Sequence, residues 1–228
     1  TVVQHLTKMK FGILIILFLA NISCKDATEN KSDEIKLDRF ELIPEPDKAE
    51  KEKYLSNLKL TEFLENPIDL QEFKTKKGQS LSSVTNGLDY HFHPEIKDSI
   101  YYHYSTFPIE NSKEKIAPID VIVFKYGKNT HNWNDDTEIL IEFTVYGKDN
   151  DLKSANLVGL TKTELESEFG SDYKLLENKV VYSIGNRALI IELENSKVIW
   201  FKFIKLSTEN IDSELIKQIL KNVVQHRL

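Results

Sequence analysis

The chain has 228 residues, of which 40% are hydrophobic, 29% charged and 10% aromatic, and this composition is typical of a globular protein rather than a disordered one. Its formal net charge is −6, and −8 once Lys8 and Lys10 leave with the N-terminal segment described next. This argues against nucleic acid as a partner, because binding phosphates needs a basic surface. Cys24 is the only cysteine, so the chain cannot form an internal disulfide and its fold must depend on packing.

The N-terminal residues have the composition of a secretion signal. Met9 is the only methionine, and we expect translation to begin there, with residues 1–8 as an upstream extension. Lys10 supplies a positive charge, and residues 11–20 (FGILIILFLA) form an apolar run of the length found in signal peptides. A transmembrane helix needs about 20 apolar residues, so this run is too short to cross a bilayer. The sequence therefore predicts a signal peptide over residues 1–23.

The end of this segment, residues 19–24 (LANISC), resembles the lipobox of bacterial lipoproteins. In that family the cysteine thiol is alkylated by diacylglycerol and the preceding peptide is removed. The resemblance implies that Cys24 becomes the lipid-bearing first residue of an exported protein, anchored to a bacterial membrane. Lys25-Asp26 resembles the charged export tag of surface lipoproteins of the Bacteroidetes, which favours the outer membrane or cell surface over the inner membrane. The alternative is an ordinary secretory signal with a chance cysteine.

Two segments of different character follow the anchor. Residues 25–34 (KDATENKSDE) contain a single apolar residue, Ala27, and predict a flexible tether because they cannot bury enough surface to offset the entropy of ordering. Residues 35–46 alternate briefly between apolar and polar side chains and contain two prolines. That pattern is typical of a short edge strand or an extended arm.

A surface helix is predicted after Asp47, which can cap it. We expect Tyr54, Leu55 and Leu58 to face the protein, with charged residues on the opposite side. The pattern also allows a break before Thr61. Asn66-Pro67 ends the region.

Four segments rich in tyrosine, phenylalanine, valine and isoleucine then predict an antiparallel meander. The segment Ile119–Tyr126 is predicted to be a central strand, covered on both faces, because its apolar residues occur at both odd and even positions. The four predicted strands are Leu88–His93, Ser99–Phe107, Ile119–Tyr126 and Glu138–Tyr146.

A helix can be placed closely within residues 156–206. Thr161 and Glu164 have the spacing of a capping box, which predicts a helix over Lys162–Phe169. Gly170 then supplies a residue with positive φ to end it.

Three strands are predicted after this helix. Gly185-Asn186 predicts a two-residue hairpin, and residues 195–197 predict a three-residue turn. The pairs that these turns set are Ile184 with Arg187, Tyr182 with Leu189, and Leu193 with Ile199. The residues then expected on the core face are Tyr182, Ile184, Leu189, Ile191, Leu193, Ile199, Phe201 and Phe203.

A last helix, capped by Asp212, is expected to cover that core face. Its apolar residues at helical spacing are Leu215, Ile216, Ile219, Leu220 and Val223. Together these patterns predict an α+β fold of antiparallel meanders with helices packed on one face. We expect two sub-domains that share a core: residues 47–155, an N-terminal helix with an antiparallel β region, and residues 156–228, a helix-meander-helix module. The lipidated tether and arm, residues 24–46, precede them.

The second sub-domain contains a recognisable signature. Residues 159–170 (GLTKTELESEFG), followed by strands joined at residues 194–198, resemble a motif of small lipoprotein modules, G-hydrophobic-T-x-x-E-hydrophobic-x-x-x-hydrophobic-G. Such modules include the smallest lipoprotein of the outer-membrane β-barrel assembly machinery and the β-lactamase inhibitor protein. The resemblance covers residues 159–206. It implies a module that binds other proteins through an exposed sheet face.

The outer face of the predicted three-stranded sheet is therefore a candidate interaction surface. It would place Glu192 opposite Trp200 and Ile190 opposite Lys202, a shallow surface with an aromatic centre of the kind found at interface hot spots. The alternative is that a helix or the N-terminal region covers this face, because tryptophan is usually buried.

Residues 128–137 (KNTHNWNDDT) contain a second candidate contact residue, Trp133. Oxygen-bearing side chains surround it, so calcium binding is an alternative. The segment lacks the ordered spacing and the glycine of an EF-hand, and a solvated hairpin tip is favoured.

Three histidines form a weak candidate metal site. His91 and His93 fall on one face of a predicted strand, and His103 would join them only if the strand register placed it opposite His91. Two partly exposed histidines on a hairpin are the favoured interpretation.

Familiar catalytic and cofactor motifs are missing from the sequence. The eight glycines are too far apart for a phosphate-binding loop, and neither H-E-x-x-H nor G-x-S-x-G occurs. We therefore expect no cofactor and no enzymatic activity. The leading hypothesis is a membrane-anchored lipoprotein that acts as a protein-binding or envelope-assembly module for another envelope or secreted protein. An inhibitor or immunity-type lipoprotein is one alternative, and a hydrolase whose catalytic groups meet only in the fold is another.

Overall fold

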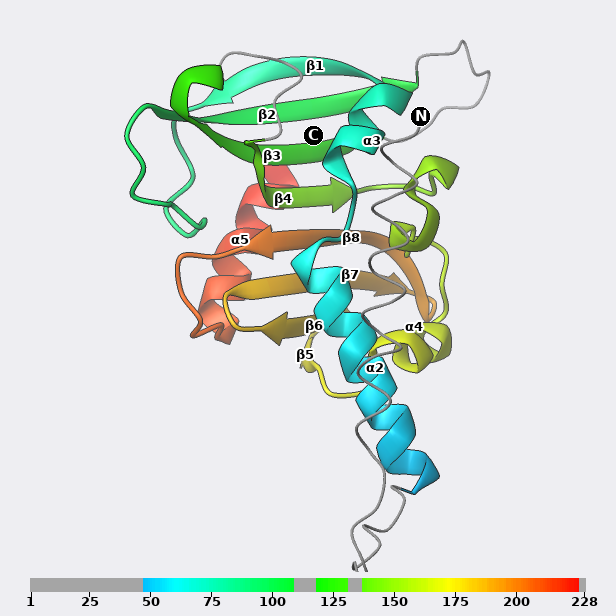
Figure 1. Ribbon diagram of the computed structural model, residues 1–228. Helices are drawn as coiled ribbons and strands as arrows, with labels where there is room; N and C mark the ends of the chain where they lie inside the picture. Colours follow the sequence, from blue (N-terminus) through cyan, green and yellow to red (C-terminus); the bar gives the residue numbers. More distant parts are fainter. Residues whose placement is uncertain (1–46, 109–117, 131–136, 226–228) are drawn as a thin grey trace, which may run out of the picture. The chain divides into compact units, whose positions relative to one another are not determined.

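The computed structural model describes residues 47–108, 118–130 and 137–225. They form an eight-stranded antiparallel sheet with helices on both faces (Figure 1), which confirms the predicted α+β class. The elements in chain order are α2 (Lys48–Glu65), α3 (Leu70–Lys76), β1 (Lys77–Val84), β2 (Ser99–Pro108), β3 (Ile119–Tyr126), η1 (Gly127–Asn129), β4 (Ile139–Val145), η2 (Asn150–Ala155), α4 (Lys162–Phe169), β5 (Lys174–Leu176), β6 (Lys179–Ile184), β7 (Arg187–Glu194), β8 (Lys197–Lys205) and α5 (Ser213–Gln225).

The sheet consists of two four-stranded meanders joined by their last strands. Its order is β1-β2-β3-β4-β8-β7-β6-β5, so β4 pairs with β8 at the seam. Residues 47–155 supply the first meander and residues 156–228 the second. All neighbouring strands are antiparallel, and the strand order of the second meander is the reverse of that of the first. In topology, a rotation of 180° about an axis normal to the sheet therefore exchanges the two meanders. This relation places α3 and α4, which precede the meanders, on the same face (Figure 1).

Helices α2, α3 and α4 cover what we call the first face of the sheet. Leu60 and Leu64 of α2, Phe73 of α3 and Leu165 of α4 are buried in one core with the strands of both meanders. This core includes Val121 and Val123 of β3, Phe143 and Val145 of β4, Tyr182 of β6, Leu189 and Ile191 of β7, and Phe201 and Phe203 of β8. Burial at this scale, about 1.5–3 kcal/mol for each large apolar side chain, holds the two meanders together.

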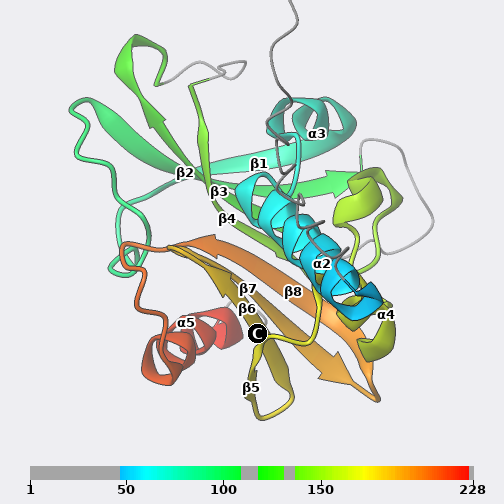
Figure 2. The same cartoon turned by 60° about the horizontal axis from the view of Figure 1, so that its bottom comes forward.

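Helix α5 covers the opposite, second face (Figure 2). Ile216 and Ile219 of α5 pack on Val181, Ala188 and Ile204 of the sheet. The prediction that this helix covers the first face was wrong, and so was the prediction that the helices pack on one face only. The first face is occupied by α2 and α4, which leaves the second face for the amphipathic α5.

Helix α2 begins as predicted but packs differently. The Asp47 carboxylate accepts a hydrogen bond from the backbone N–H of Glu50 at 2.7 Å. The helix continues through Thr61 without a break, and Leu60 and Leu64 are the leucines it buries. Its N-terminal half extends past the edge of the sheet (Figure 1). The residues predicted to face the protein lie on the opposite side of the helix from the buried Leu60 and Leu64 and are exposed. These residues are Tyr54, Leu55 and Leu58.

Helix α4 confirms the predicted capping box. The backbone N–H of Glu164 donates to the Thr161 hydroxyl at 3.2 Å, and the backbone N–H of Thr161 donates to the Glu164 carboxylate at 2.7 Å. Gly170 ends the helix with φ +79°. The Tyr182 hydroxyl donates to the Gly170 carbonyl at 2.8 Å and fixes this end of α4 against the sheet.

None of the described helices combines the length and apolar character needed to cross a bilayer.

The predicted register of the second meander is confirmed at its first hairpin, where Gly185-Asn186 joins β6 to β7. The observed pairs are Ile184 with Arg187 and Tyr182 with Leu189. Beyond this hairpin, Glu192 lies opposite Trp200 and Ile190 opposite Lys202, also as predicted.

The next turn is shorter than predicted. Asn195 and Ser196 form it alone, with φ +50° and +61°, the combination of a type I′ hairpin. Leu193 consequently pairs with Val198, and Ile199 is the extra residue of a β-bulge. The predicted pairing of Leu193 with Ile199 was therefore wrong, and Val198 takes the place of Ile199 in the first core.

Three of the four strands predicted in the first meander are confirmed within one residue, as β2, β3 and β4. The central β3 is buried on both faces, as expected. The predicted strand Leu88–His93 was wrong, because this segment makes only an isolated bridge, His91 with Leu206. The sequence did not predict β1 (KGQSLSSV), because it lacks apolar alternation.

Candidate functional site

A cleft of about 500 Å³, which we call the α2 cleft, lies beside the C-terminal half of α2, between this helix, η2 and α4. Leu157 and Phe169 are buried at its base, and Phe63 and Leu160 line it while still partly exposed. Two lysines and two glutamates are the charged residues of the lining: Lys59, Lys153, Glu62 and Glu168. An apolar base with a few polar groups around it is the usual composition of a binding site.

Phe63 connects the α2 cleft to the first core. It follows Leu60 by three residues on α2 and so lies near the same side of the helix. Its ring centroid is 5.2 Å from that of Phe169 on α4 and 6.4 Å from that of Phe201 on β8. These aromatic contacts hold the Phe63 ring in place and leave part of it accessible from the cleft.

Two ion pairs bound the α2 cleft. Lys59 Nζ on α2 lies 2.9 Å from Glu168 Oε2 on α4. Lys153 Nζ on η2 lies 2.7 Å from Glu72 Oε1 on α3, which Lys76 also contacts at 2.7 Å. Hydrogen bonds from Lys153 and then Lys76 lower the pKa of Glu72 to about 2. Because these side chains are largely exposed, the pairs position groups around the cleft more than they stabilise the fold.

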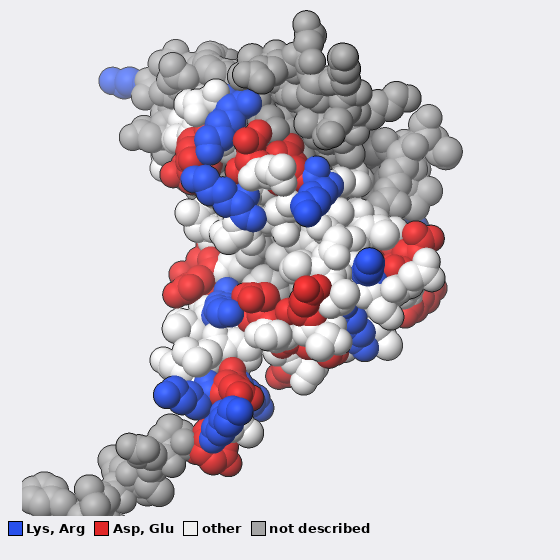
Figure 3. Space-filling model, turned by 90° about the vertical axis from the view of Figure 1, so that its right-hand side faces the viewer, with Lys and Arg blue, Asp and Glu red and all other residues white. Residues whose placement is uncertain are grey.

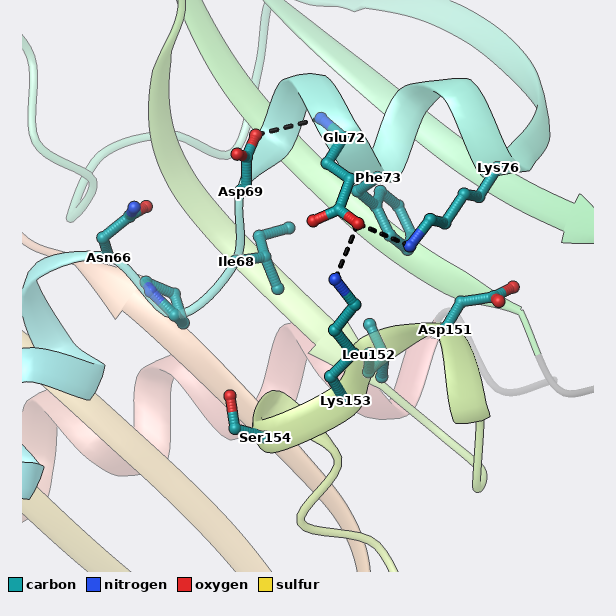
Figure 4. A pocket seen from close by; sticks show the side chains of 11 residues that line it. Asn66, Ile68, Asp69, Glu72, Phe73, Lys76, Asp151, Leu152, Lys153 and Ser154 are labelled. Atoms are coloured by element: carbon teal, nitrogen blue, oxygen red, sulfur yellow. Dashed lines mark hydrogen bonds and ion pairs between the residues drawn. The ribbon is translucent and has the colours of Figure 1, made fainter.

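The second of these ion pairs closes a smaller hollow of about 230 Å³ that adjoins the α2 cleft (Figure 4). Figure 4 shows the Glu72 carboxylate between the amines of Lys76 and Lys153. The two hollows share Asn66, Pro67, Lys153 and Ser154. Figure 3, which views the side on which α4 lies, shows charged groups separated by uncharged surface.

The backbone is strained where η2 borders the cleft. Lys153 has φ +52° and ψ −121°, a conformation that costs a residue with a side chain about 1–3 kcal/mol. Such strain persists only where surrounding contacts impose it, and it often occurs at ligand sites. Three residues on, Asn156 lines the cleft, and its buried amide oxygen Oδ1 has no hydrogen-bond partner among the residues that the structure describes.

The predicted interaction surface on the sheet is not exposed. Trp200 is 2% exposed, Ile190 fully buried and Lys202 buried, because α5 packs over this face. Glu192 is half-buried and accepts a hydrogen bond from the Trp200 indole nitrogen. These four residues belong to the interior of the described fold, and assigning them to an exposed contact surface was wrong.

Lys202 instead takes part in a buried polar cluster on the second face. It forms an ion pair with Glu142 of β4, whose other carboxylate oxygen lies 2.9 Å from His91 Nε2. Burial alone would raise the pKa of Glu142. The charge of Lys202 and the hydrogen bond and charge of His91 outweigh that effect and lower the pKa to about 2.

The three histidines of the weak metal prediction are separated, each with its own partner. His91 pairs with Glu142, His93 Nδ1 lies 2.8 Å from the Tyr101 hydroxyl, and His103 Nε2 lies 3.1 Å from Asp120 Oδ1. The strand register places His103 next to Ser82 and Ile122 rather than His91. In the described part of the chain, no three His, Cys, Asp or Glu residues form a group that could hold a metal ion.

The pair of Asp120 and His103 is the arrangement closest to a catalytic one. Burial raises the pKa of Asp120, but hydrogen bonds from His103 and Ser105 and the His103 charge lower it on balance. The Ser105 hydroxyl is thus bonded to the acid, whereas nucleophilic catalysis needs a hydroxyl bonded to the base. His103 and Asp120 orient each other without activating Ser105.

Two predicted features lie outside the described residues: the lipid attachment at Cys24, with the whole segment 1–46, and Trp133 with its loop neighbours 131–136. The α2 cleft, in turn, was not predicted from the sequence. The 3-4 spacing of Leu60, Phe63 and Leu64, uninterrupted until Pro67, was the signal that α2 continues past Thr61.

No family model, curated protein or solved structure matches the chain. The proposed function therefore rests on the sequence and on the geometry of the α2 cleft.

Proposed function

We propose that this chain is an exported lipoprotein, tethered to a bacterial membrane through Cys24, that binds another protein of the cell envelope through the α2 cleft. The observation that carries the binding role is the partly exposed apolar surface of Phe63 and Leu160, surrounded by paired charges. An apolar centre with a polar, solvent-accessible rim is the usual anatomy of a protein interface.

More apolar side chains are exposed along α2, beside the α2 cleft. Leu55 and Leu58 line a neighbouring hollow of about 880 Å³, which shares Lys59 with the cleft, and Tyr54 is exposed beside them. Exposed apolar side chains gathered on one element mark interaction sites more often than isolated ones do. With α5 over the residues predicted to form a contact surface on the sheet, the side of α2 is the contact surface that we propose.

Site-specific photo-cross-linking tests the binding role. Ser154, an exposed residue of the cleft, is replaced by a photoreactive amino acid in the full-length chain within living cells. Ser213, an exposed serine on the opposite side of the sheet at the start of α5, is the matched control. We expect a discrete adduct with one envelope protein from position 154 and none from position 213. Identical adducts from both positions, or none from either, would contradict binding through the cleft.

The anchor is tested separately through Cys24. The variant Cys24→Ala should no longer incorporate a fatty-acid label and should leave the membrane fraction, since one alkylated cysteine supplies the tether. The wild-type chain labelled in parallel is the control. Sedimentation of Cys24→Ala with membranes to the wild-type extent would rule out the lipid tether and leave the α2 cleft unaffected.

A further inference from the structure

The amide oxygen of Asn156 is an acceptor for which the described fold supplies no donor. It is buried and lines the α2 cleft, while the backbone N–H of the same residue donates to the Lys153 carbonyl at 3.2 Å. Buried acceptors in native proteins nearly always have a hydrogen-bond partner, because an unpaired one loses its bond to water without replacement. An exception at the wall of a cleft indicates a ligand that brings an N–H or O–H group.

The backbone that carries this oxygen is held on both sides. Asn156 is the C-cap of η2, three residues after the strained Lys153 and directly before the buried Leu157. The Lys153 side chain is in turn held by Glu72. The acceptor therefore lies on backbone that is anchored on both sides, so that only the Asn156 side chain would have to turn toward a donor in the cleft.

The rest of the α2 cleft restricts the ligand further. Its charged lining residues balance, with two lysines and two glutamates, so the cleft favours no net charge. Phe63 and Leu160 offer apolar contact on the same cleft. A hydrocarbon chain would fit the apolar part but would leave the Asn156 oxygen without a partner. An uncharged group that combines an apolar side chain with an N–H donor satisfies both.

We infer that the α2 cleft binds an uncharged, extended peptide segment of its partner protein, with a backbone N–H donated to Asn156 Oδ1 and an apolar side chain placed against Phe63 and Leu160. Extended peptides present backbone N–H groups and side chains in regular alternation, which suits a cleft with one acceptor beside an apolar base. This inference rests on the proposed function and specifies the chemistry by which the cleft recognises its partner.

The test uses two small probes and the full-length protein. The first probe is acetyl-leucyl-leucine methyl ester, which is uncharged and carries two backbone N–H groups. The second is the same compound with both nitrogens methylated, which keeps the apolar side chains and removes the donors. Binding is followed by nuclear magnetic resonance, through the shifts of the Asn156 side-chain amide and of the Leu157 and Leu160 backbone. We expect the first probe to shift these signals and to bind about fivefold more tightly than the second, as one hydrogen bond allows.

Two variants separate recognition from loss of structure. Asn156→Leu removes the acceptor but keeps a side chain of similar size, so it should bind both probes equally while its spectrum stays folded. Asn210→Leu changes an exposed asparagine near α5 and should keep the wild-type preference. Equal binding of both probes by the wild-type chain, or binding of neither, would overturn the inference.

These outcomes are distinguishable from failure of the proposed function. A specific adduct from position 154 together with no probe preference would retain the protein-binding role and reject this mode of recognition. A clear preference for the first probe without any adduct would retain the chemistry of the cleft and reject the envelope protein as its occupant.

Discussion

Glu142 of β4 and Lys202 of β8 form a buried ion pair across the seam at which the two meanders meet. Each comes from the last strand of its meander, and the two are 60 positions apart in the chain. The pair joins the two halves electrostatically on the second face, while apolar packing joins them on the first. A charged pair at this place makes the seam sensitive to substitution and to acid.

Replacing one partner of this pair should destabilise the protein strongly. In Glu142→Gln the charge of Lys202 stays buried without its counter-charge, and we expect the free energy of unfolding to fall by about 3 kcal/mol. Urea denaturation measures this. Glu214→Gln, which disrupts the exposed pair of Glu214 with Lys217 on α5, is the control and should cost less than about 0.5 kcal/mol. Similar decreases in the free energy of unfolding of the two variants would mean that the buried pair stabilises the fold no more than the exposed pair does.

The same carboxylate predicts how stability depends on pH. The pKa of Glu142 is lowered in the folded protein to about 2 from an ordinary value of 4.5. Its contribution is therefore fully present above about pH 4.5 and is lost as the pH falls toward 2, because the unfolded chain takes up the proton first. Thermal unfolding between pH 7 and pH 3 should show a decline that begins near 4.5. The decline should be shallower in Glu142→Gln; equal slopes would contradict the assignment.

The burial of Trp200 beneath α5 can be measured by fluorescence. Trp133 and Trp200 are the only tryptophans, so Trp133→Phe leaves Trp200 as the sole emitter. We expect blue-shifted emission and little quenching by acrylamide, because the side chain is buried. Urea-unfolded protein gives the exposed reference. Native emission that matches this reference would show that α5 does not cover the second face.

The packing of α2 on α4 predicts an effect at Gly170. A Cβ there would lie 3.0 Å from the Ser56 hydroxyl, and the residue has φ +79°, so Gly170→Ala should cost about 1–2 kcal/mol. Ser56→Ala in the same chain should recover part of this loss by removing the oxygen.

Gly159→Ala is the matched control for that experiment. Gly159 has φ +93°, but its Cβ would meet no atom within 4 Å, so this variant reports backbone strain alone. Ser56→Ala should not rescue it. Equal rescue of both glycine variants would show that Ser56 and Gly170 are not in contact.

The sequence predicted much of the fold through signals that act over a few residues. The Asp47 cap, the Thr161 capping box and the hairpin at Gly185-Asn186 all satisfy hydrogen bonds or φ angles within their own segment, and the structure confirms all three. The turn at Asn195-Ser196 failed because two-residue and three-residue turns compete closely there. A β-bulge at Ile199 compensates for the one-residue difference in turn length, and the alternation of apolar and polar residues does not reveal this bulge.

The candidate site was less predictable, because it depends on which helix covers which face. Tyr54, Leu55 and Leu58 have the spacing of a buried stripe, yet α2 buries its opposite side, which carries Leu60 and Leu64. Trp200 has the pattern of an exposed hot spot, yet α5 covers it. In both cases the amphipathic pattern identifies an apolar surface but does not show which other element, if any, packs against it.

The sequence by itself determined β2, β3 and β4, the helix caps and the first hairpin of the second meander, because the signals for these elements lie between near neighbours in the chain. Only the tertiary structure decided that β4 pairs with β8, that α5 occupies the second face, and that Phe63 and Asn156 meet in one cleft. Those outcomes depend on contacts between residues far apart in the chain. Such contacts are selected by the packing of the whole apolar surface, which no short segment encodes.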